Sequence, residues 1–463
     1  MLPFQLVKTL VEPEIEKKTF FLGPAFAEQL GLDLKGNLPV NLHLSTGRSR
    51  MISGRAIMDW RLDGLGLHAS VLSSLALKSG RRYGFSYQNG VLRLGPVFGI
   101  MADVEAGSRR LFGNQDSFIR NLILHGQSLG EVCFAFSPYS INWQHKSIDG
   151  YTWSKGGWQK KNFPLPDVIY YRGADYANGK KNIRRKLEAQ GCRFVNPLPV
   201  DKWKAHRILA HNHELARYLP ETLLVNDFRQ VQSMLKRHHA VYLKPVYGSK
   251  GQNIIRITRN KNKSSKIYQY QHSSLDHSIS FRSMDALQSQ ISPQLRKRRY
   301  LIQNRINLIK SSGRIIDIRA LVQKDHTGEW DITGLACRMG GAGSITSNLS
   351  AGGQGHKLEH VLQGHFLDEK QQEMIGKEIR YLALSVVRNL EQTMGPAGEM
   401  GIDIGVDQQG DIWFIEANLR PARRIFIVIG EKELRIQSIE KPLTYARYLA
   451  GFTSEYRASD GLI

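Results

Sequence analysis

Residues 401–421, GIDIGVDQQGDIWFIEANLRP, constrain the fold of this chain more than any other stretch. Two runs of alternating apolar residues flank a turn, which predicts a β-hairpin. The first run carries Asp403, and the second carries Glu416 and Asn418. With a turn centred on residues 409–410, Asp403 lies opposite Glu416, and opposed side chains have Cβ atoms about 4.5–5.5 Å apart. Like charges so close are destabilising, so the hairpin needs a positive partner.

These side chains predict a metal site. Mg²⁺ prefers oxygen ligands, and two carboxylates with one amide oxygen suit it, with Mn²⁺ as a substitute. Residues two apart on a strand share a face, so Glu416 and Asn418 are expected on the face of Ile412 and Phe414. The alternative is a solvated edge hairpin. Gly401, expected opposite Asn418, favours the metal site because it leaves space for a ligand.

A lysine and a glycine loop follow each other in VYLKPVYGSKGQN, residues 241–253. Lys244 falls on a predicted strand, just before Gly248, Ser249 and Gly251. Such a loop lets phosphate approach closely and offers it backbone N–H donors. No GxxxxGK[ST] sequence occurs in the chain, so this is not a P-loop. A flexible turn without a ligand is the alternative.

A second hairpin is predicted over residues 314–339, RIIDIRALVQKDHTGEWDITGLACRM, with its turn at DHTG. Arg319 and Arg338 then share one face with Asp317. Two arginines on one strand face favour a clamp for phosphate or carboxylate, and a solvated face is the alternative. Asn348, in SITSNLSAGG, is a candidate polar contact in the loop that follows.

The 463 residues are too many for one compact core, so several domains are expected. Residues 1–95 contain short alternating runs between turn residues, which predict a β-rich module. Residues 96–198 alternate strand-like and helix-like segments, as a small α/β domain does. Residues 199–455, which carry all the motifs above, form the largest predicted domain.

Two helices are predicted within that largest domain. VDKWKAHRILAHNHELARYLPET is expected to form one helix from residue 200 to near Pro220. Residues 368–394 form the clearest helix, because apolar residues recur there at steps of three and four. Gly395 and Pro396 are expected to stop it.

The amino-acid composition narrows the classes of binding partner and the cellular compartment that we expect. Lys and Arg number 64 against 41 Asp and Glu, and the net charge of +23 favours anionic partners. Nucleotides, nucleic acid, acidic peptides and anionic envelope polymers all qualify. Three scattered cysteines without metal-ligand spacing favour a reducing compartment. No apolar run of about 18 residues and no signal-peptide core is found, so we expect a soluble intracellular protein.

The motifs together resemble those of the ATP-grasp superfamily. DK, LKP, DIR and EAN occur in its order, at 201–202, 243–245, 317–319 and 416–418. The closer resemblance is to the YheC/YheD group, endospore coat-associated ATP-grasp proteins of spore-forming bacteria. It extends from about residue 92 to 450 through LRLGPVFGIM, FVNPLPVDKWKAH, YLKPVYGSKGQNI, DIRALVQKD, TSNLSAGG, GEMGIDIGVD and IWFIEANLRP.

The resemblance implies an α+β, ATP-grasp fold in which two subdomains clasp ATP. A glycine-loop subdomain would span about 240–300 and a metal-binding subdomain about 301–430. Residues 96–198 would be the small α/β domain that precedes an ATP-grasp domain, following the N-terminal β-rich module at 1–95.

It also implies a role for each candidate residue. Lys202 and Lys244 would contact the phosphates, and Gln303 with the backbone near Ile306 would contact the adenine. Asp403, Glu416 and Asn418 would bind Mg²⁺. Arg319, Arg338 and Asn348 would contact the γ-phosphate and the acyl group. One departure follows the metal ligands. The superfamily often has Pro-Gly where this chain has Pro421-Ala422, and alanine tolerates fewer backbone conformations.

The implied function is an ATP-dependent carboxylate–amine ligase that forms an acyl phosphate. Its location would be cytoplasmic on the mother-cell side, with association to the spore coat, and its substrates could include an acidic peptide or coat component. The alternative is an ATP-binding structural coat or adhesion protein without turnover. Nucleic-acid binding is disfavoured, because the basic stretches RNKNKSSK and QLRKRR lack interleaved aromatic residues.

Overall fold

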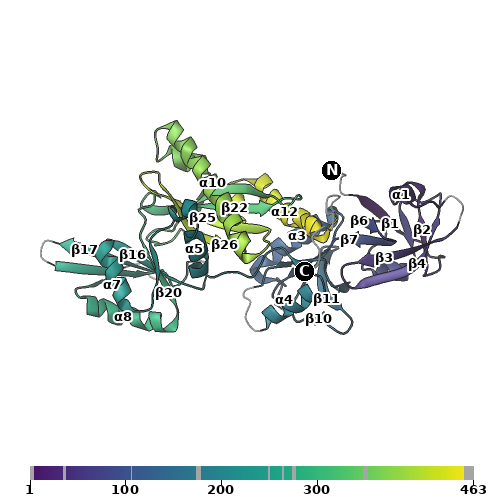
Figure 1. The fold of residues 1–463 in the computed structure, drawn as a ribbon, viewed down its shortest axis with the longest axis horizontal. Helices are drawn as coiled ribbons and strands as arrows, with labels where there is room; N and C mark the ends of the chain where they lie inside the picture. Colours follow the sequence, from purple (N-terminus) through teal and green to yellow (C-terminus); the bar gives the residue numbers. More distant parts are fainter. Residues whose placement is uncertain are drawn as a thin grey trace. The chain divides into compact units, whose positions relative to one another are not determined.

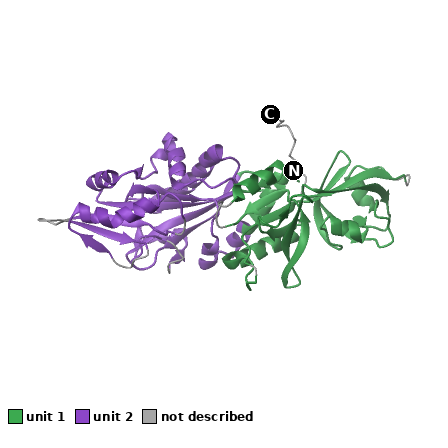
Figure 2. Ribbon diagram, turned by 90° about the horizontal axis from the view of Figure 1, so that it is seen from below, with its two compact units in different colours: residues 1–196, 324–329, 439–463 green, residues 197–323, 330–438 purple. Residues whose placement is uncertain are grey.

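The computed structural model describes residues 5–34, 38–105, 107–173, 179–248, 251–262, 265–273, 278–347 and 353–452. The chain forms two compact units, distinguished by colour in Figure 2. Unit 1 comprises residues 1–196, 324–329 and 439–463, and unit 2 comprises residues 197–323 and 330–438. Each unit therefore combines segments that are distant in the sequence.

Unit 1 begins with a closed β-barrel (Figure 1). In order around the barrel, its strands are β1 (Leu6–Val11), β5 (Leu65–Leu67), β2 (Thr19–Leu22), β4 (Arg50–Met58), β3 (Val40–Thr46), β7 (Val91–Gly95) and β6 (Arg82–Gln88). Alternate residues such as Phe20, Leu22, Leu42 and Leu44 are fully buried inside it. Short helices α1 (Pro24–Gln29) and α2 (Ala69–Ser74) accompany these strands. Closure leaves no unpaired strand edge in the barrel.

A mixed sheet follows the barrel in unit 1. Its strand order is β10 (Ile141–Asn142), β11 (Ser147–Ser154), β9 (Val132–Phe136), β8 (Val97–Met101), β13 (Val168–Tyr171) and β14 (Arg193–Phe194), with β12 (Gly157–Pro164) paired to β11. Helix α3 (Asp116–Ser128) and the second half of α12 (Lys432–Ala450) share a core with this sheet. Helix α4 (Lys180–Ala189) precedes β14.

The barrel and this sheet share one apolar core. Phe85 and Leu94 of the barrel belong to the same buried cluster as Phe134 and Phe163 of the sheet. The backbone joins them as well, since Arg48 N donates to Leu165 O at 2.8 Å. The division of the sequence at residues 95 and 198 stays a prediction, because unit 1 packs as one body.

The first sheet of unit 2 has the order β15 (Thr222–Leu224), β20 (Tyr300–Asn304), β16 (Ala240–Pro245), β17 (Ile255–Asn262), β18 (Ser265–His272) and β19 (Ile279–Phe281). Helices α7 (Phe228–Arg237) and α8 (Met284–Lys297) lie against it (Figure 1) and share a core with Val241, Leu243 and Ile302. Because side chains alternate along a strand, Lys244 and Gln303 point to the opposite face.

The second sheet of unit 2 has the order β24 (Gln354–His356), β23 (Trp330–Met339), β22 (Arg314–Lys324), β25 (Glu399–Val406) and β26 (Ile412–Asn418), with β21 (Lys310–Ser311) paired to β22. Helix α10 (Glu369–Met394) packs on it, and Ile379 shares a core with Ile318 and Ile402. Alternation leaves Asp317 and Arg319 on the other face. Short helix α9 (Leu358–Gln363) lies between β24 and α10 in the sequence, and short helix α11 (Arg424–Val428) follows β26.

The long helix predicted at 368–394 is confirmed as α10. Its N-cap is Asp368, whose side chain accepts from Lys370 N at 3.0 Å. It ends at Gly395, where φ is 88°, a conformation that glycine adopts without strain. Within the described part of the chain, the helices are too short or too polar to cross a membrane.

The single helix predicted from 200 to near Pro220 is wrong. The structure has α5 (Lys202–Ala210) and, after a break, α6 (His213–Ala216). The side chain of Asn212 accepts from Glu214 N and Leu215 N at 3.0 and 3.3 Å, so it caps a new helix. A residue of this type competes with the helical backbone and favours caps, which interrupts the helix.

Candidate functional site

The hairpin β25–β26 pairs its polar residues as the sequence predicts. Asp403 lies opposite Glu416 and Gly401 opposite Asn418. The turn differs from the prediction, because Val406 pairs with Ile412 and the register shifts between Asp403 and Ile404. A β-bulge thus adds one residue to β26 and restores the expected pairing beyond the turn.

The bulge reverses the face on which Glu416 was expected. Phe414 pairs with Ile404, and both are buried in the core beneath α10. Since directly opposed residues share a face, Glu416 lies with Asp403 on the other face. The expectation that Glu416 shares a face with Ile412 and Phe414 is therefore wrong. The extra residue turns the carboxylate away from the core.

Two arginines bind the Asp403 carboxylate. Arg319 is its direct partner on β22, with Nε 2.5 Å from Oδ1 and Nη2 3.1 Å from Oδ2. Arg338 Nη2 lies 2.8 Å from Asp403 Oδ2, and its Nε donates to Asp317 Oδ1 at 2.7 Å. The four side chains form a buried cluster, two acids and two guanidiniums, at the centre of the sheet.

The charges of this cluster are mutually dependent. Burial by itself would raise the pKa of Asp403, but the guanidiniums of Arg319 and Arg338 outweigh it and hold that pKa below its usual value. Burial raises the pKa of Asp317, because Arg338 offsets the desolvation only in part. The arginines thus supply positive charge where Asp403 and Glu416 meet.

Lys202 and Lys244 approach Glu416 from two other elements. Lys202 begins α5, whose N-cap Asp201 accepts from Lys204 N at 2.8 Å. Its Nζ donates to Gly248 O at 2.6 Å and lies 3.3 Å from Glu416 Oε1.

Lys244, on β16, makes no ion pair with any residue that the structure describes. Burial lowers its pKa to about 8, and the charge of Glu416 offsets this only in part. A desolvated ammonium without a partner is a ready binding group for an incoming anion.

A single pocket in unit 2 brings most of the candidate residues together. Its lining includes Lys202, Lys244, Gly251, Gln303, Ile306, Arg319, Arg338, Asp403, Glu416 and Asn418. Gly248 adjoins it through the hydrogen bond from Lys202. Gln303 is held by Thr222, to whose Oγ1 its Nε2 donates at 2.9 Å. Ser249 and Asn348 lie outside the described residues.

The pocket also contains cations that the sequence did not single out. Arg305 and Lys310 line it, and burial, followed by repulsion from Arg305 and Arg256, lowers the pKa of Lys310. Ser347 lines it too and donates to Asp317 Oδ2 at 2.5 Å. No spacing in the sequence relates these residues, because they meet only where separate strands converge.

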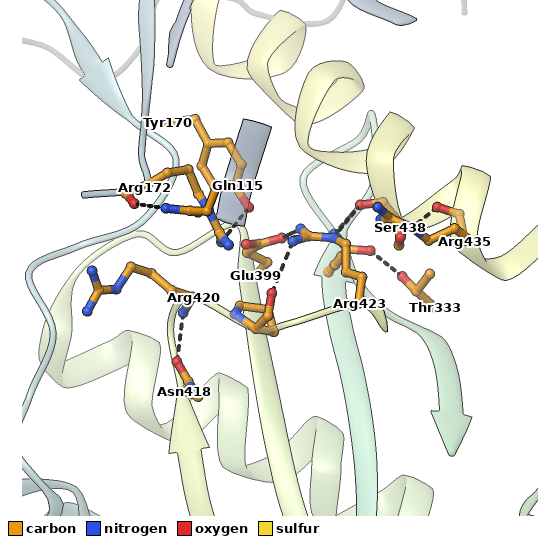
Figure 3. A network of polar contacts seen from close by, with 12 residues as sticks. Gln115, Tyr170, Arg172, Thr333, Glu399, Asn418, Arg420, Arg423, Arg435 and Ser438 are labelled. Atoms are coloured by element: carbon orange, nitrogen blue, oxygen red, sulfur yellow. Dashed lines mark hydrogen bonds and ion pairs between the residues drawn. The ribbon is translucent and has the colours of Figure 1, made fainter. Parts of the chain in front are cut away.

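A buried network holds the chain just after Asn418 (Figure 3). Asn418 Oδ1 accepts from Arg420 N at 2.9 Å. Arg423 donates to Pro421 O at 3.2 Å and to Ser438 O at 2.9 Å, and it pairs with the fully buried Glu399. Arg423 therefore connects the carbonyl of Pro421 to the sheet.

The alanine after Pro421 needs none of the freedom of glycine. Ala422 is exposed, and its φ lies outside the left-handed region. The guanidinium of Arg423 holds the loop in position. The same guanidinium pairs with Glu399, which also accepts a hydrogen bond from Gln323.

Two sheets with helices on their outer faces, around a pocket of lysines, arginines and paired acids, define an ATP-grasp protein. The family model described as YheC/D like ATP-grasp matches residues 191–449. The chain belongs to this family and has its α+β, ATP-grasp fold.

The chain is also similar to two curated proteins. The chain is 28% identical to the endospore coat-associated protein YheD of Bacillus subtilis (strain 168) over 373 residues, covering 78% of this chain and 80% of YheD. It is 26% identical to YheC of the same strain over 325 residues, covering 68% and 87%.

Among solved structures, the D-cycloserine synthetase DcsG aligns with 12% identity and a TM-score of 0.46, over 76% of this chain and 99% of that one. The D-alanine–D-alanine ligase from Coxiella burnetii aligns with 13% identity and a TM-score of 0.42, over 76% and 96%. These similarities concern the fold alone.

The Arg423 network predicts a large effect from a substitution that conserves charge. Arg423→Lys cannot reach Pro421, Ser438 and Glu399 at once, so Glu399 stays buried with an incomplete partner. We expect unfolding to require about 3 kcal/mol less free energy, seen as a lower Tm in calorimetry. Arg424→Lys is the matched control, since Arg424 is exposed. Equal Tm values for the two variants would contradict this role.

Proposed function

We propose that the protein is an ATP-dependent carboxylate–amine ligase that acts through an acyl phosphate. The observation that carries this proposal is the convergence, in one pocket, of Lys202 and Lys244 with Arg319 and Arg338 around paired acids. A pocket with this excess of cations suits a polyphosphate and a second anionic group together.

The nucleotide would lie between the two sheets of unit 2. The phosphates would take Lys244, which lacks an ion pair among the described residues, and Lys202, which already spans the gap between Gly248 and Glu416. Gly251 lines the same pocket, and Gln303 with the backbone at Ile306 would meet the adenine. Gln303 is buried and fixed by Thr222, so it is preorganised for a base edge.

A divalent cation fits the acidic side of the pocket. Asp403, Glu416 and Asn418 offer hard oxygen atoms, lie on adjacent strands and line the same pocket. Mg²⁺, or Mn²⁺ in its place, would neutralise phosphate charge when bound there. Asp403 is already paired with Arg319 and Arg338, so these arginines and the metal compete for its oxygens.

The reaction needs no side-chain nucleophile. A substrate carboxylate oxygen would bond to the γ-phosphorus as the bond from that phosphorus to the β–γ bridging oxygen breaks, which releases ADP. An amine nitrogen would then bond to the acyl carbon, phosphate would leave, and the nitrogen would lose a proton to solvent. Arg319 and Arg338 would hold the transferring group and offset its charge, since phosphoryl transfer depends on positioning and electrostatics.

The relatives suggest where this activity operates. YheD and YheC are named endospore coat-associated proteins. We propose that this protein acts in the cytoplasm on the mother-cell side, in association with the spore coat. An acidic peptide or coat component is the substrate class that its charge of +23 favours.

A structural coat or adhesion protein that binds ATP without turnover is the second candidate, and the same charge favours it. Release of ADP that depends on a carboxylate and an amine together distinguishes the ligase. Nucleotide binding without ADP release, across a panel of acidic peptides and amines, would instead establish the structural candidate.

Replacement of Glu416 tests the catalytic assignment. Glu416→Gln keeps the shape but removes a charge from the acid pair, so ADP formation should fall about 100-fold or more. Asp411→Asn, at the exposed turn of the same hairpin, is the matched control and should keep full activity. Undiminished ADP formation by Glu416→Gln would overturn the assignment.

Metal binding should depend on the nucleotide. Mn²⁺ alone must displace arginines from Asp403, whereas a polyphosphate gives those arginines another partner. A non-hydrolysable ATP analogue should therefore increase Mn²⁺ affinity about tenfold or more, measured by electron paramagnetic resonance. Arg319→Gln should bind Mn²⁺ better than the native protein without the analogue. If neither the ATP analogue nor Arg319→Gln changes the affinity for Mn²⁺, the proposed competition for Asp403 is contradicted.

Lys244 predicts a pH dependence of nucleotide binding. Its pKa of about 8 lies below the usual value, so the free protein loses this charge as the pH rises through about 8. Affinity for an ATP analogue should thus fall about tenfold between pH 7.5 and pH 9.5, measured by calorimetry. Lys244→Arg stays charged and should flatten this profile. A flat profile in the native protein would contradict the role of Lys244.

A further inference from the structure

Unit 1 contains a second pocket, which the proposed ligase reaction does not use. It lies between the barrel and the hairpin β11–β12, and four cations line it. Arg50 begins β4, Lys78 and Arg81 lie between α2 and β6, and Lys161 lies on β12. We call it the unit 1 pocket.

Strand alternation and barrel packing bring these cations together. On β12, Lys160 pairs with Asp149 at 3.4 Å, and its neighbour Lys161 points to the opposite face. Arg50 is tied to the same strand, since its Nη2 donates to Asn162 Oδ1 at 2.6 Å. The barrel end and the hairpin thus hold the pocket's two sides at a defined separation.

The positive charge of this pocket is unbalanced. Among the described residues, Lys78, Arg81 and Lys161 form no ion pair. Burial, followed by repulsion from Arg81, Lys161 and Lys155, lowers the pKa of Lys78. Mutual repulsion of this kind is relieved when an anion binds between the cations.

The acidic group in the described lining does not cancel this charge. Glu131 lines the pocket and is fully buried. Its carboxylate oxygen Oε1 lies 3.0 Å from Arg447 Nε, so its charge already has a partner. The positive charge of the four lining cations therefore remains available to a ligand.

The walls indicate which anion fits. Leu77, Val132 and Phe163 are apolar, and Gln127 and Thr152 add polar groups. Short aliphatic stems that end in carboxylates match this combination, and arginine binds a carboxylate through two parallel hydrogen bonds.

Nucleic acid fits less well, because single strands stack their bases on accessible aromatic rings. Phe163 is buried against Phe134, with ring centroids 4.1 Å apart. Tyr83 is buried too, and its hydroxyl accepts from Lys78 N at 2.9 Å. The aromatic rings of the lining are therefore inaccessible for stacking with a nucleic-acid base.

We propose that the unit 1 pocket binds a carboxylate-rich peptide segment, through Arg50, Lys78, Arg81 and Lys161. The proposal stands independently of the ligase assignment, since it concerns another pocket in another unit. A docked acidic segment would be held by unit 1 whether or not unit 2 turns over ATP.

The test is binding of a fluorescent hexaglutamate peptide to the full-length protein, followed by anisotropy. Lys78→Ala combined with Arg81→Ala should weaken binding about tenfold or more. The matched control, Lys17→Ala combined with Arg109→Ala, removes the same charge from exposed sites of unit 1 and should change little. Equal loss in both double variants would mean attraction by net charge alone and would overturn the proposal.

A second variant guards against a folding defect. Lys161→Glu changes an exposed side chain and should also weaken the peptide, while affinity for an ATP analogue stays native in every variant. Tripolyphosphate and oligothymidylate serve as competing probes. If either binds this pocket more tightly than hexaglutamate, or if Lys161→Glu binds hexaglutamate normally, the proposal is overturned.

Discussion

The central interaction of the site is the Asp403 carboxylate held by Arg319 and Arg338. It joins three strands of one sheet, because Arg319 lies on β22, Arg338 on β23 and Asp403 on β25. A carboxylate buried alone would protonate, and arginines buried alone would be too costly to desolvate. Each charge thus offsets the cost of burying the others, and the pocket wall depends on the set.

Strand alternation extends this arrangement to the whole of unit 2. One face of each sheet packs on helices, so every second residue is apolar and buried. Some of the residues between them line the pocket, and Lys244, Gln303, Arg319 and Asp403 are among these. The same alternation of side chains therefore sets both the core face and the pocket face of each strand. A shift of one residue would move the pocket side chains to the core face.

Such a shift occurs at the bulge in β26, and it limited what could be predicted. Local pattern predicted the hairpin, the pairing of Asp403 with Glu416, and α10. The bulge was not visible, because a five-residue turn with a bulge and a tighter turn without one give the same pairing. Asn212 divided a predicted helix, since its capping hydrogen bonds compete with helix continuation. Arg305 and Lys310 were missed because no repeat marks them.

The sequence by itself determined the elements and their chemical content: which segments are strands, where the acids and cations lie along them, and the family to which the chain belongs. Short-range rules, such as alternation, helical spacing and motif order, carry that information. Only the tertiary structure decided which side of the hairpin Glu416 occupies, that the arginines already neutralise Asp403, and that Arg423 holds the loop after Asn418. Those outcomes depend on contacts between segments that are distant in the sequence. Only these contacts bury the side chains, and burial then determines their charge interactions and the side to which they point.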